Sequence, residues 1–352
     1  MSKTAKMALF AGALLAPAAA HAQTQVEEII VTAQKREERL LDVGVNVSAL
    51  PTQVLEDRRV NQVTDVLGLV PNVDIKEQVP GAMPVLTIRG VGLDDFSATN
   101  NPTAGVYVDE VFLTSTAMMS SELFDLERVE VLKGPQGTLY GRNTTAGALN
   151  IITAKPKPTF EAMAKAGYGS FETFEAEGMI NAPLGATSAL RIAARAVDQN
   201  EGFWTSRLLP GETIGQRNVF AGRVQLALGL GADWDANLKL EGLRSRSEMG
   251  QGEFFGTIDP LTFGPCAPIL AGRVDNSRCT DFFGYTDTDG DPFTGDWPKD
   301  AFYDIDAWDV TATLKGSIGD VQVTSITGYR ESDRAFEIDS DATPARQVDF
   351  TQ

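Results

Sequence analysis

Histidine is almost missing from this 352-residue sequence: His21 is the single one, and it lies in a segment that we expect to be removed. Without an imidazole, the mature chain lacks the base of Ser-His-Asp and Cys-His catalysis. It also lacks the ligand of His-bound zinc, copper and haem. We therefore expect no enzyme, no catalytic residue, no cofactor and no metal site.

Long apolar runs are missing as well. No segment of the mature chain has 18 unbroken apolar residues, so the sequence predicts no transmembrane helix. The N-terminus combines Lys3 and Lys6 with a short apolar run, Met7–Leu15, and with small residues before Gln23. This pattern predicts a secretory signal peptide over residues 1–22, the alternative being a buried N-terminal helix. An exported chain of this kind is periplasmic, secreted or an outer-membrane β-barrel.

Basic residues and cysteines are scarce. The formal charge is −18, and removal of the two leader lysines takes it to −20. This acidic balance argues against a nucleic-acid partner, which would need a basic face. The two cysteines, Cys266 and Cys279, are expected to form one disulfide in an exported chain. Two free thiols are the alternative.

The second half of the chain has a regular strand pattern. Leu190, Ile192 and Ala194 alternate with Arg191 and Arg195. The same alternation recurs at 160–168, 174–180, 220–228, 234–241, 308–315 and 321–331. Short glycine turns join some of these strands and long links join the others. One apolar face, one polar face and loop lengths segregated by end are typical of a transmembrane β-barrel. A soluble β-sandwich is the alternative.

The first half mixes short strands, short helices and glycine turns. Pro51 suits the first turn of a helix, and apolar residues over 63–70 follow helical spacing. Strands are expected near 43–47, 85–89, 105–109, 128–133 and 148–153. The sequence therefore predicts a compact α+β domain from Asp42 to Pro158.

Four motifs stand in one order along this half of the chain. They are EEIIVTAQKRE at 27–37, LTIRGVG at 86–92, GVYVDEV at 105–111, and DLERVEVLKGPQGTLYGRNTTAGALNIITAKP at 125–156. Together with the signal peptide and the strands that follow, they resemble a TonB-dependent outer-membrane receptor, and the resemblance covers residues 1–352.

The resemblance implies a plug domain inside a barrel. Residues 23–41 would be an N-terminal arm with the TonB box, 42–158 the plug, and 159–352 a partial barrel with a long extracellular loop at 248–304. Only seven barrel strands can be counted in the sequence, whereas this family has about 22. We therefore expect a fragment, the plug and the first part of the barrel.

The resemblance also assigns the TonB box. Its residues are Ile29, Ile30, Val31, Thr32 and Ala33. A short β-prone segment in a polar arm suits strand addition to a partner's sheet edge, and the resemblance implies that this partner is the periplasmic part of TonB. The alternative is an ordinary first strand of the plug.

Five further residues carry expectations about the plug. In the family, basic residues at the positions of Arg89 and Lys133 pair with barrel-wall carboxylates, the alternative being solvated surface cations. Gly134, Gly137 and Gly141 are expected to take positive φ in tight turns near the wall. Turns with no role in transport are equally compatible with these glycines.

The link Glu248–Asp304 holds eleven acidic, three basic and ten aromatic residues. It could offer a stacking surface to a ligand or pack a small core around the disulfide. Residues 287–291 have some features of a calcium loop, although the glycine is misplaced for an EF-hand.

The resemblance implies energised uptake of a large scarce nutrient, such as an iron-siderophore complex, across the outer membrane of a Gram-negative bacterium. TonB with its inner-membrane energising complex, the nutrient and outer-membrane lipid would be the partners. A non-transporting binding protein or adhesin that keeps the plug is the alternative.

Overall fold

The computed structural model describes residues 29–66, 68–79, 82–93, 101–115, 118–119, 122–252, 254–273, 278–287, 289–298, 301–339, 342–344 and 349–351. The expected signal peptide, residues 1–22, lies outside this part of the chain. None of the described helices is long and apolar enough to cross a membrane.

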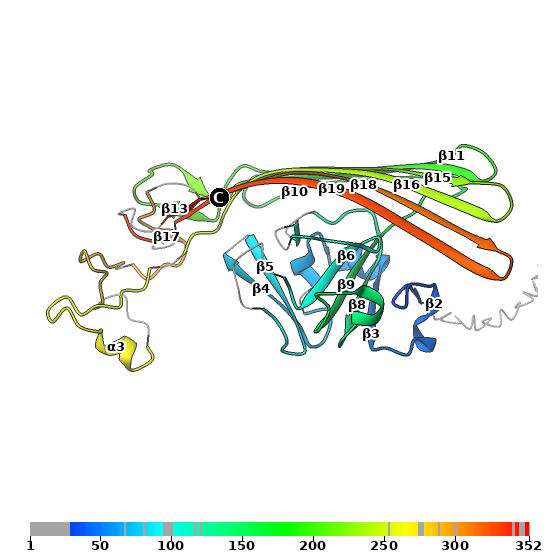
Figure 1. Cartoon of the computed structure of the whole chain (residues 1–352). Helices are drawn as coiled ribbons and strands as arrows, with labels where there is room; N and C mark the ends of the chain where they lie inside the picture. The colour runs from blue at the N-terminus through cyan, green and yellow to red at the C-terminus, as the bar shows by residue number, and fades with distance from the viewer. Residues whose placement is uncertain are drawn as a thin grey trace, which may run out of the picture.

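The chain folds into two bodies, which we call the plug domain (residues 42–158) and the wall sheet. Figure 1 shows the wall sheet arching over the plug domain. The expectation of an α+β plug followed by the first antiparallel strands of a barrel is confirmed.

The plug domain is built on a five-stranded sheet of order β3-β8-β9-β6-β7. Its pairs are antiparallel except β6 with β9, which run parallel. The sheet strands are β3 (Val47–Pro51), β6 (Ala104–Val108), β7 (Val111–Phe112), β8 (Leu126–Lys133) and β9 (Gly147–Thr153). A separate hairpin joins β4 (Val73–Val79) to β5 (Ala82–Ile88). The helical turns are α1 (Thr52–Asp57), η2 (Val63–Val66) and α2 (Gly137–Tyr140).

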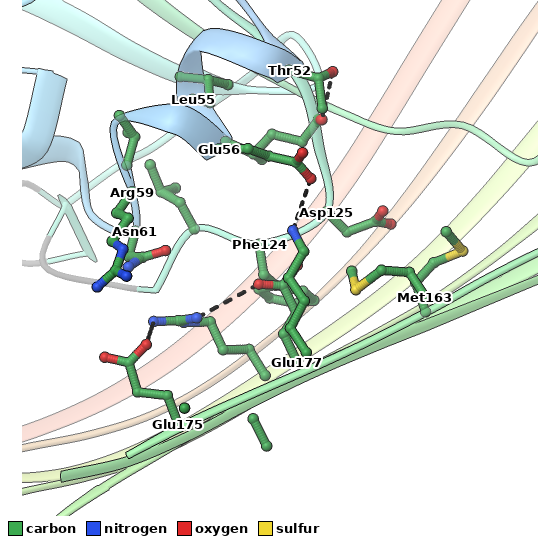
Figure 2. A pocket seen from close by; sticks show the side chains of 18 of the residues that line it. Thr52, Leu55, Glu56, Arg59, Asn61, Phe124, Asp125, Met163, Glu175 and Glu177 are labelled. Atoms are coloured by element: carbon green, nitrogen blue, oxygen red, sulfur yellow. Dashed lines mark hydrogen bonds and ion pairs between the residues drawn. The ribbon is translucent and has the colours of Figure 1, made fainter. Parts of the chain in front are cut away.

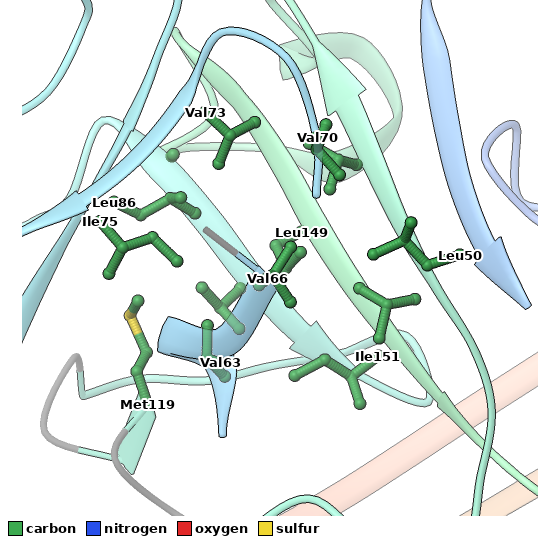
Figure 3. Packing of buried hydrophobic residues seen from close by; sticks show 14 of the residues in the cluster. Leu50, Val63, Val66, Val70, Val73, Ile75, Leu86, Met119, Leu149 and Ile151 are labelled. Carbon is green, nitrogen blue, oxygen red and sulfur yellow. The ribbon is translucent and has the colours of Figure 1, made fainter. Parts of the chain in front are cut away.

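The plug core lies between this sheet and the turns that cover it. Val63 and Val66 of η2 point at Leu149 and Ile151 of β9, with Leu50 of β3 beside them (Figure 3). All seven residues of strand β9 are buried. Pro51 ends β3 and stands directly before α1, at its N-cap position and not in the first turn as expected, whereas the expected strand at 43–47 starts only at Val47.

The wall sheet is antiparallel, with order β10-β11-β12-β15-β16-β18-β19-β20. Its seven long strands are β10 (Glu161–Gly169), β11 (Thr173–Pro183), β12 (Ser188–Gln199), β15 (Arg217–Gly229), β16 (Trp234–Glu248), β18 (Phe302–Ile318) and β19 (Val321–Asp339). The count of seven therefore holds for the long strands, and the short β20 (Asp349–Thr351) adds an eighth.

The burial pattern of the wall sheet is inverted relative to a soluble sheet. On β12, Arg191 and Arg195 are 5% and 6% exposed, whereas Ile192 between them is 45% exposed. Burying cations and exposing aliphatic side chains is costly in water. The pattern fits a wall with lipid outside and a polar domain inside, and it argues against the β-sandwich alternative.

The two ends of the wall sheet differ. Turns at 184–187, 230–233 and 319–320 are short, and they share one end. The long links at 200–216 and 249–301 share the other end, where Thr173 pairs with Gln199. The links carry a small sheet of β13 (Trp204–Ser206), β14 (Thr213–Ile214) and β17 (Thr294–Gly295), and helix α3 (Ala267–Leu270).

Candidate functional site

The wall sheet holds the plug through cations on its inner face. Arg191 of β12 makes a two-point contact with Asp125: Nε lies 2.8 Å from Oδ2 and Nη2 lies 2.5 Å from Oδ1. Arg195, two inward positions farther along β12, places Nε 2.9 Å from Glu122 Oε2. Arg217 of β15 reaches the other oxygen of Glu122 at 2.5 Å. The plug segment 122–125 is thus held by charge-assisted hydrogen bonds.

A second contact centres on Asp109, which follows β6. Its Oδ2 lies 3.0 Å from Lys239 Nζ of β16, and its Oδ1 accepts from the backbone N–H of Thr153 at 3.1 Å. Lys155 Nζ lies 2.5 Å from Oδ1. Burial alone would raise the pKa of Asp109, but Lys155 and Lys239 outweigh it and hold this pKa well below its ordinary value.

Between these contacts, β15 reaches the plug backbone. Arg223 donates to the carbonyl oxygens of Phe124 and Asp125, each at 3.2 Å, and its guanidinium lies 4.4 Å from the centre of the Phe124 ring. Gln225 donates to the carbonyl of Ala154 at 2.8 Å. Backbone groups of the plug are thereby satisfied by the wall.

We call Asp109, Glu122 and Asp125 with their wall partners the anchor. Asp109 and Glu122 are buried, the side chain of Asp125 is 5% exposed, and Arg191, Arg195 and Lys239 are buried too. Breaking a buried pair by removing one partner costs about 3–5 kcal/mol because the other charge is left unpaired. The anchor therefore fixes the plug against β12, β15 and β16.

The N-terminal arm is docked on the plug. β1 (Ile30–Val31) forms a hairpin with β2 (Glu38–Arg39), which the 3-10 turn η1 (Leu40–Asp42) follows. Within the expected TonB box, Ile29 and Ile30 are partly exposed, Thr32 is nearly covered, and Val31 and Ala33 are 0% exposed. The arm packs on Leu132, Tyr140 and Ala148 of the plug. Figure 1 places β2 near the short-turn end of the wall sheet.

One carboxylate holds the docked arm. Glu130 of β8 is 0% exposed, and its Oε1 accepts from the Thr32 backbone N–H at 2.8 Å. Arg128 Nε donates to the same oxygen at 2.7 Å, and Asn150 donates to the Thr32 hydroxyl at 3.4 Å. We call Thr32, Arg128, Glu130 and Asn150 the arm latch.

Arg89 and Lys133 are brought together. A Cβ built on Gly134 would lie 3.6 Å from Nη1 of Arg89, so Arg89 reaches the residue after Lys133. Burial, and then the charge of Arg89, lower the pKa of Lys133. In the described part of the chain, neither side chain has a carboxylate partner. Their pairing with barrel-wall carboxylates stays a prediction.

The three plug glycines differ. Gly134 and Gly141 take φ of 105° and 80°, as expected. Gly137 does not, since it starts helix α2. Among the described residues, no atom lies within 4 Å of a Cβ at Gly137 or Gly141, so the approach of these turns to the wall stays a prediction. Gly147, which the sequence reasoning missed, has φ of 153°, and a Cβ there would lie 2.2 Å from the Leu132 carbonyl oxygen.

The long link contains a disulfide between Cys266 and Cys279, with Cα atoms 5.8 Å apart. Phe254, Tyr285 and Trp297 pack in a small core, whereas Phe282 and Phe283 are 82% and 76% exposed. The small core includes Ile214 but neither cysteine, so it does not form around the disulfide as expected, and the stacking surface stays a prediction.

Two aspartates of the suggested calcium loop, Asp287 and Asp289, have another partner. Arg207 contacts Asp287, Asp289 and Asp296. The described residues contain no cluster of three side chains suited to a metal ion.

The sequence predicts the wall side of the anchor but not its partners on the plug. The strand alternation places Arg191, Arg195 and Arg223 on the inner face, but nothing in the pattern pairs them with Glu122 or Asp125 across the fold. The expected polarity, plug cation to wall carboxylate, is reversed in the anchor.

A cavity of about 1000 Å³ lies between the plug domain and strands β10 and β11 (Figure 2). Glu56 of α1 crosses it to Lys165 of β10 at 2.8 Å. Arg195 also reaches Glu175 of β11 at 3.2 Å. The cavity lies beside the anchor.

Known proteins share these features. Residues 39–148 match the family model of the TonB-dependent receptor plug domain. The chain is 31% identical to the pesticin receptor of Yersinia pestis over 189 residues. The aligned region covers 52% of this chain and 28% of that protein. It is 29% identical over 205 residues to the vitamin B12 transporter BtuB of Vibrio vulnificus, covering 56% and 32%. It spans less than a third of the length of either relative.

Solved structures share the fold. The ferric yersiniabactin uptake receptor FyuA of Yersinia pestis superposes with a TM-score of 0.63 at 20% identity, covering 83% of this chain and 42% of that one. The siderophore receptor PiuA of Acinetobacter baumannii gives a TM-score of 0.65 at 18% identity, covering 85% and 38%.

The family is one of outer-membrane receptors of Gram-negative bacteria and not of enzymes. The plug domain matches the family model, it is anchored under an antiparallel wall, and receptors are among the relatives. The chain therefore belongs to the TonB-dependent receptors and has a plug domain followed by part of a barrel.

Proposed function

We propose that this chain belongs to an energised receptor that imports a large scarce nutrient, an iron chelate of the siderophore type, across the outer membrane. Among its relatives are a pesticin receptor, a vitamin B12 transporter and a catecholate siderophore receptor. Of the similar structures, one is named a siderophore receptor and another a ferric yersiniabactin uptake receptor. The iron chelate is the ligand class that recurs most among these names.

The observation that carries the proposal is the docked arm. A β-prone segment, Ile29–Ala33, lies at the short-turn end of the wall sheet, opposite the long loops. Undocked, it would offer its backbone to TonB as an added strand. Energy supplied at one end and ligand captured at the other is the arrangement that an energised transporter needs. The signal peptide at 1–22 would direct the chain to this membrane.

Proline at position 31 tests the proposal. Val31→Pro removes a backbone donor and fixes φ, so it should abolish strand addition. In cells that make the receptor at its natural length, growth and uptake are measured with a panel of iron chelates and cobalamins. Val31→Pro should abolish uptake and leave ligand binding at the cell surface unchanged. Val31→Ala, which keeps the donor, is the matched control and should transport.

Normal uptake by Val31→Pro would exclude this segment as the TonB-binding strand. Surface binding of ligand without uptake by the receptor that keeps Val31 would favour the second candidate, a non-transporting binding protein or adhesin. Exposed aromatic residues on the long link, Phe282 and Phe283, favour that candidate because they offer a binding surface at the long-loop end.

A further inference from the structure

The cavity between the plug domain and the wall follows strand β10. Its lining includes residues from Met163, near the start of β10, to Ser170 in the turn after it. At about 3.4 Å per residue this stretch is roughly 24 Å long, nearly the whole strand. On the plug side the lining comes from α1, the residues after it and segment 123–127.

Along β10 the cavity extends from the long-loop end toward the short-turn end of the wall. Ser170 lies in the turn next to Thr173, which pairs with Gln199 at the long-loop end. Met163 pairs with Met179, which lies toward the short turn that follows Pro183. A solute inside the cavity would therefore move from the long-loop end toward the short-turn end.

The plug is held unevenly around this cavity. β12, β15 and β16 carry the buried anchor. In the described residues, β10 and β11 contact the plug domain through Glu56–Lys165 and, next to the start of β10, through the contacts of Glu161 and Asn181 with Lys157. The side chains of Glu56 and Lys165 are 55% and 48% exposed. Moving α1 away from β10 breaks one solvated pair, whereas moving the plug off β12 breaks the buried pairs of Arg191 with Asp125 and of Arg195 with Glu122. The plug should therefore open first on the β10 side.

The lining is charged with both signs. Lys155, Lys157 and Lys165 face the cavity together with Glu56, Asp57 and Glu175. A lining of this kind favours hydrated, charged solutes over apolar ones. The volume, about 1000 Å³, is at the upper end for small-molecule sites.

We propose that this cavity is the passage by which a hydrophilic, charged ligand crosses beside the plug, and that the Glu56–Lys165 ion pair closes it. The inference rests on the proposed uptake function, and it names the side of the plug and the gate. The anchor keeps the plug seated on β12, β15 and β16 while the β10 side opens.

Thiol labelling tests the passage without ligand or TonB. Met163→Cys places a thiol deep in the cavity, and a hydrophilic, membrane-impermeant maleimide is added from outside to cells making the receptor. Cys266 and Cys279 form a disulfide and do not react. Adding Glu56→Lys sets two cations against each other, so labelling should rise by roughly tenfold or more. Reversing both charges, Glu56→Lys with Lys165→Glu, should restore slow labelling.

Thr311→Cys is the matched control. Thr311 lies on β18, pairs with Lys239 of the anchor and does not line the cavity. Its labelling should not change with Glu56→Lys. Faster labelling at both positions would mean that the whole plug has loosened, and it would overturn the gate. Equal labelling of Met163→Cys with and without Glu56→Lys, or no labelling at all, would overturn the passage.

The outcome is separable from that of the proposed function. Labelling that follows the gate in a receptor without energised uptake would support the passage and refute the transporter. Normal energised uptake with no gate-dependent labelling would place the route elsewhere around the plug.

Discussion

Two buried polar networks in this molecule are made of the same groups but joined differently. The anchor links two bodies through three carboxylates, each with its own cation on the wall. The arm latch holds a hairpin to the plug, with Glu130 as its single carboxylate. The anchor would have to lose several pairs to open, whereas the latch opens with one group. The difference indicates that the plug is built to stay and the arm to be released.

The largest expected effect breaks the anchor. Asp125→Asn keeps the side-chain shape and tolerates the positive φ at this position, 49°, but leaves Arg191 without its two-point partner. We expect a loss of about 3 kcal/mol in plug–wall stability. The measurement is the urea midpoint for trypsin cleavage of the plug in detergent.

Asp74→Asn is the control for this variant. Asp74 and Lys76 form an exposed pair on β4, 49% and 70% exposed, so the change should stay within about 0.5 kcal/mol. Equal midpoints for Asp125→Asn and Asp74→Asn would show that the anchor does not hold the plug.

Acid should weaken the anchor next. The pKa of Asp109 is lowered in the fold, so its stabilising contribution is present above the ordinary pKa and is lost as pH falls below it. Plug–wall stability should be flat from pH 8 to pH 5 and fall by about 2 kcal/mol below roughly pH 4. Asp109→Asn should have lower plug–wall stability at neutral pH. It should also lose less stability than the unmodified protein when the pH falls, because the contribution of Asp109 is already absent. A parallel acid profile in Asp109→Asn would assign the loss to other groups.

Releasing the arm latch should have a smaller effect on stability and a specific effect on the arm. Glu130→Gln weakens the acceptor shared by Thr32 and Arg128, at a cost of about 1–3 kcal/mol. Ala33→Cys, buried in the docked arm, should then react faster with a maleimide. The plug–wall urea midpoint should hardly change. A lower midpoint with no faster labelling would mean that Glu130 supports the plug and not the arm.

Sequence reasoning found the local elements and missed the contacts across the fold. Period-2 alternation located the seven long wall strands, because one face meets lipid and the other the plug. The partners of Arg191 and Lys239 escaped it, since Asp125 and Asp109 lie 66 and 130 positions away. The docking of Ala33 escaped it too, because an apolar segment in a polar arm reads equally well as free or buried.

Gly147 shows the same limit on a smaller scale. The neighbouring residues of the motif predict turns, but the constraint on Gly147 comes from the Leu132 carbonyl oxygen on the adjacent strand. A contact of that kind depends on the register of β8 with β9, which only the folded sheet supplies.

The smallest expected effect sharpens the contrast between latch and wall. The arm contacts the wall as well as Glu130 of the plug. Glu37 Oε1 of the arm lies 3.2 Å from Lys315 Nζ of β18. These side chains are 67% and 49% exposed, so water and salt screen the pair, and Lys315→Ala should cost no more than about 1 kcal/mol. In Lys315→Ala, Ala33→Cys should still be labelled slowly. Any difference in labelling rate from the receptor that keeps Lys315 should disappear at high salt, where the Glu37–Lys315 pair is screened. If Lys315→Ala instead exposed Ala33→Cys as much as Glu130→Gln does, the wall and not the plug would hold the arm, and release of the arm would be coupled to β18. The structure argues against that, because the arm's buried side chains, Val31 and Ala33, pack on the plug alone among the described residues.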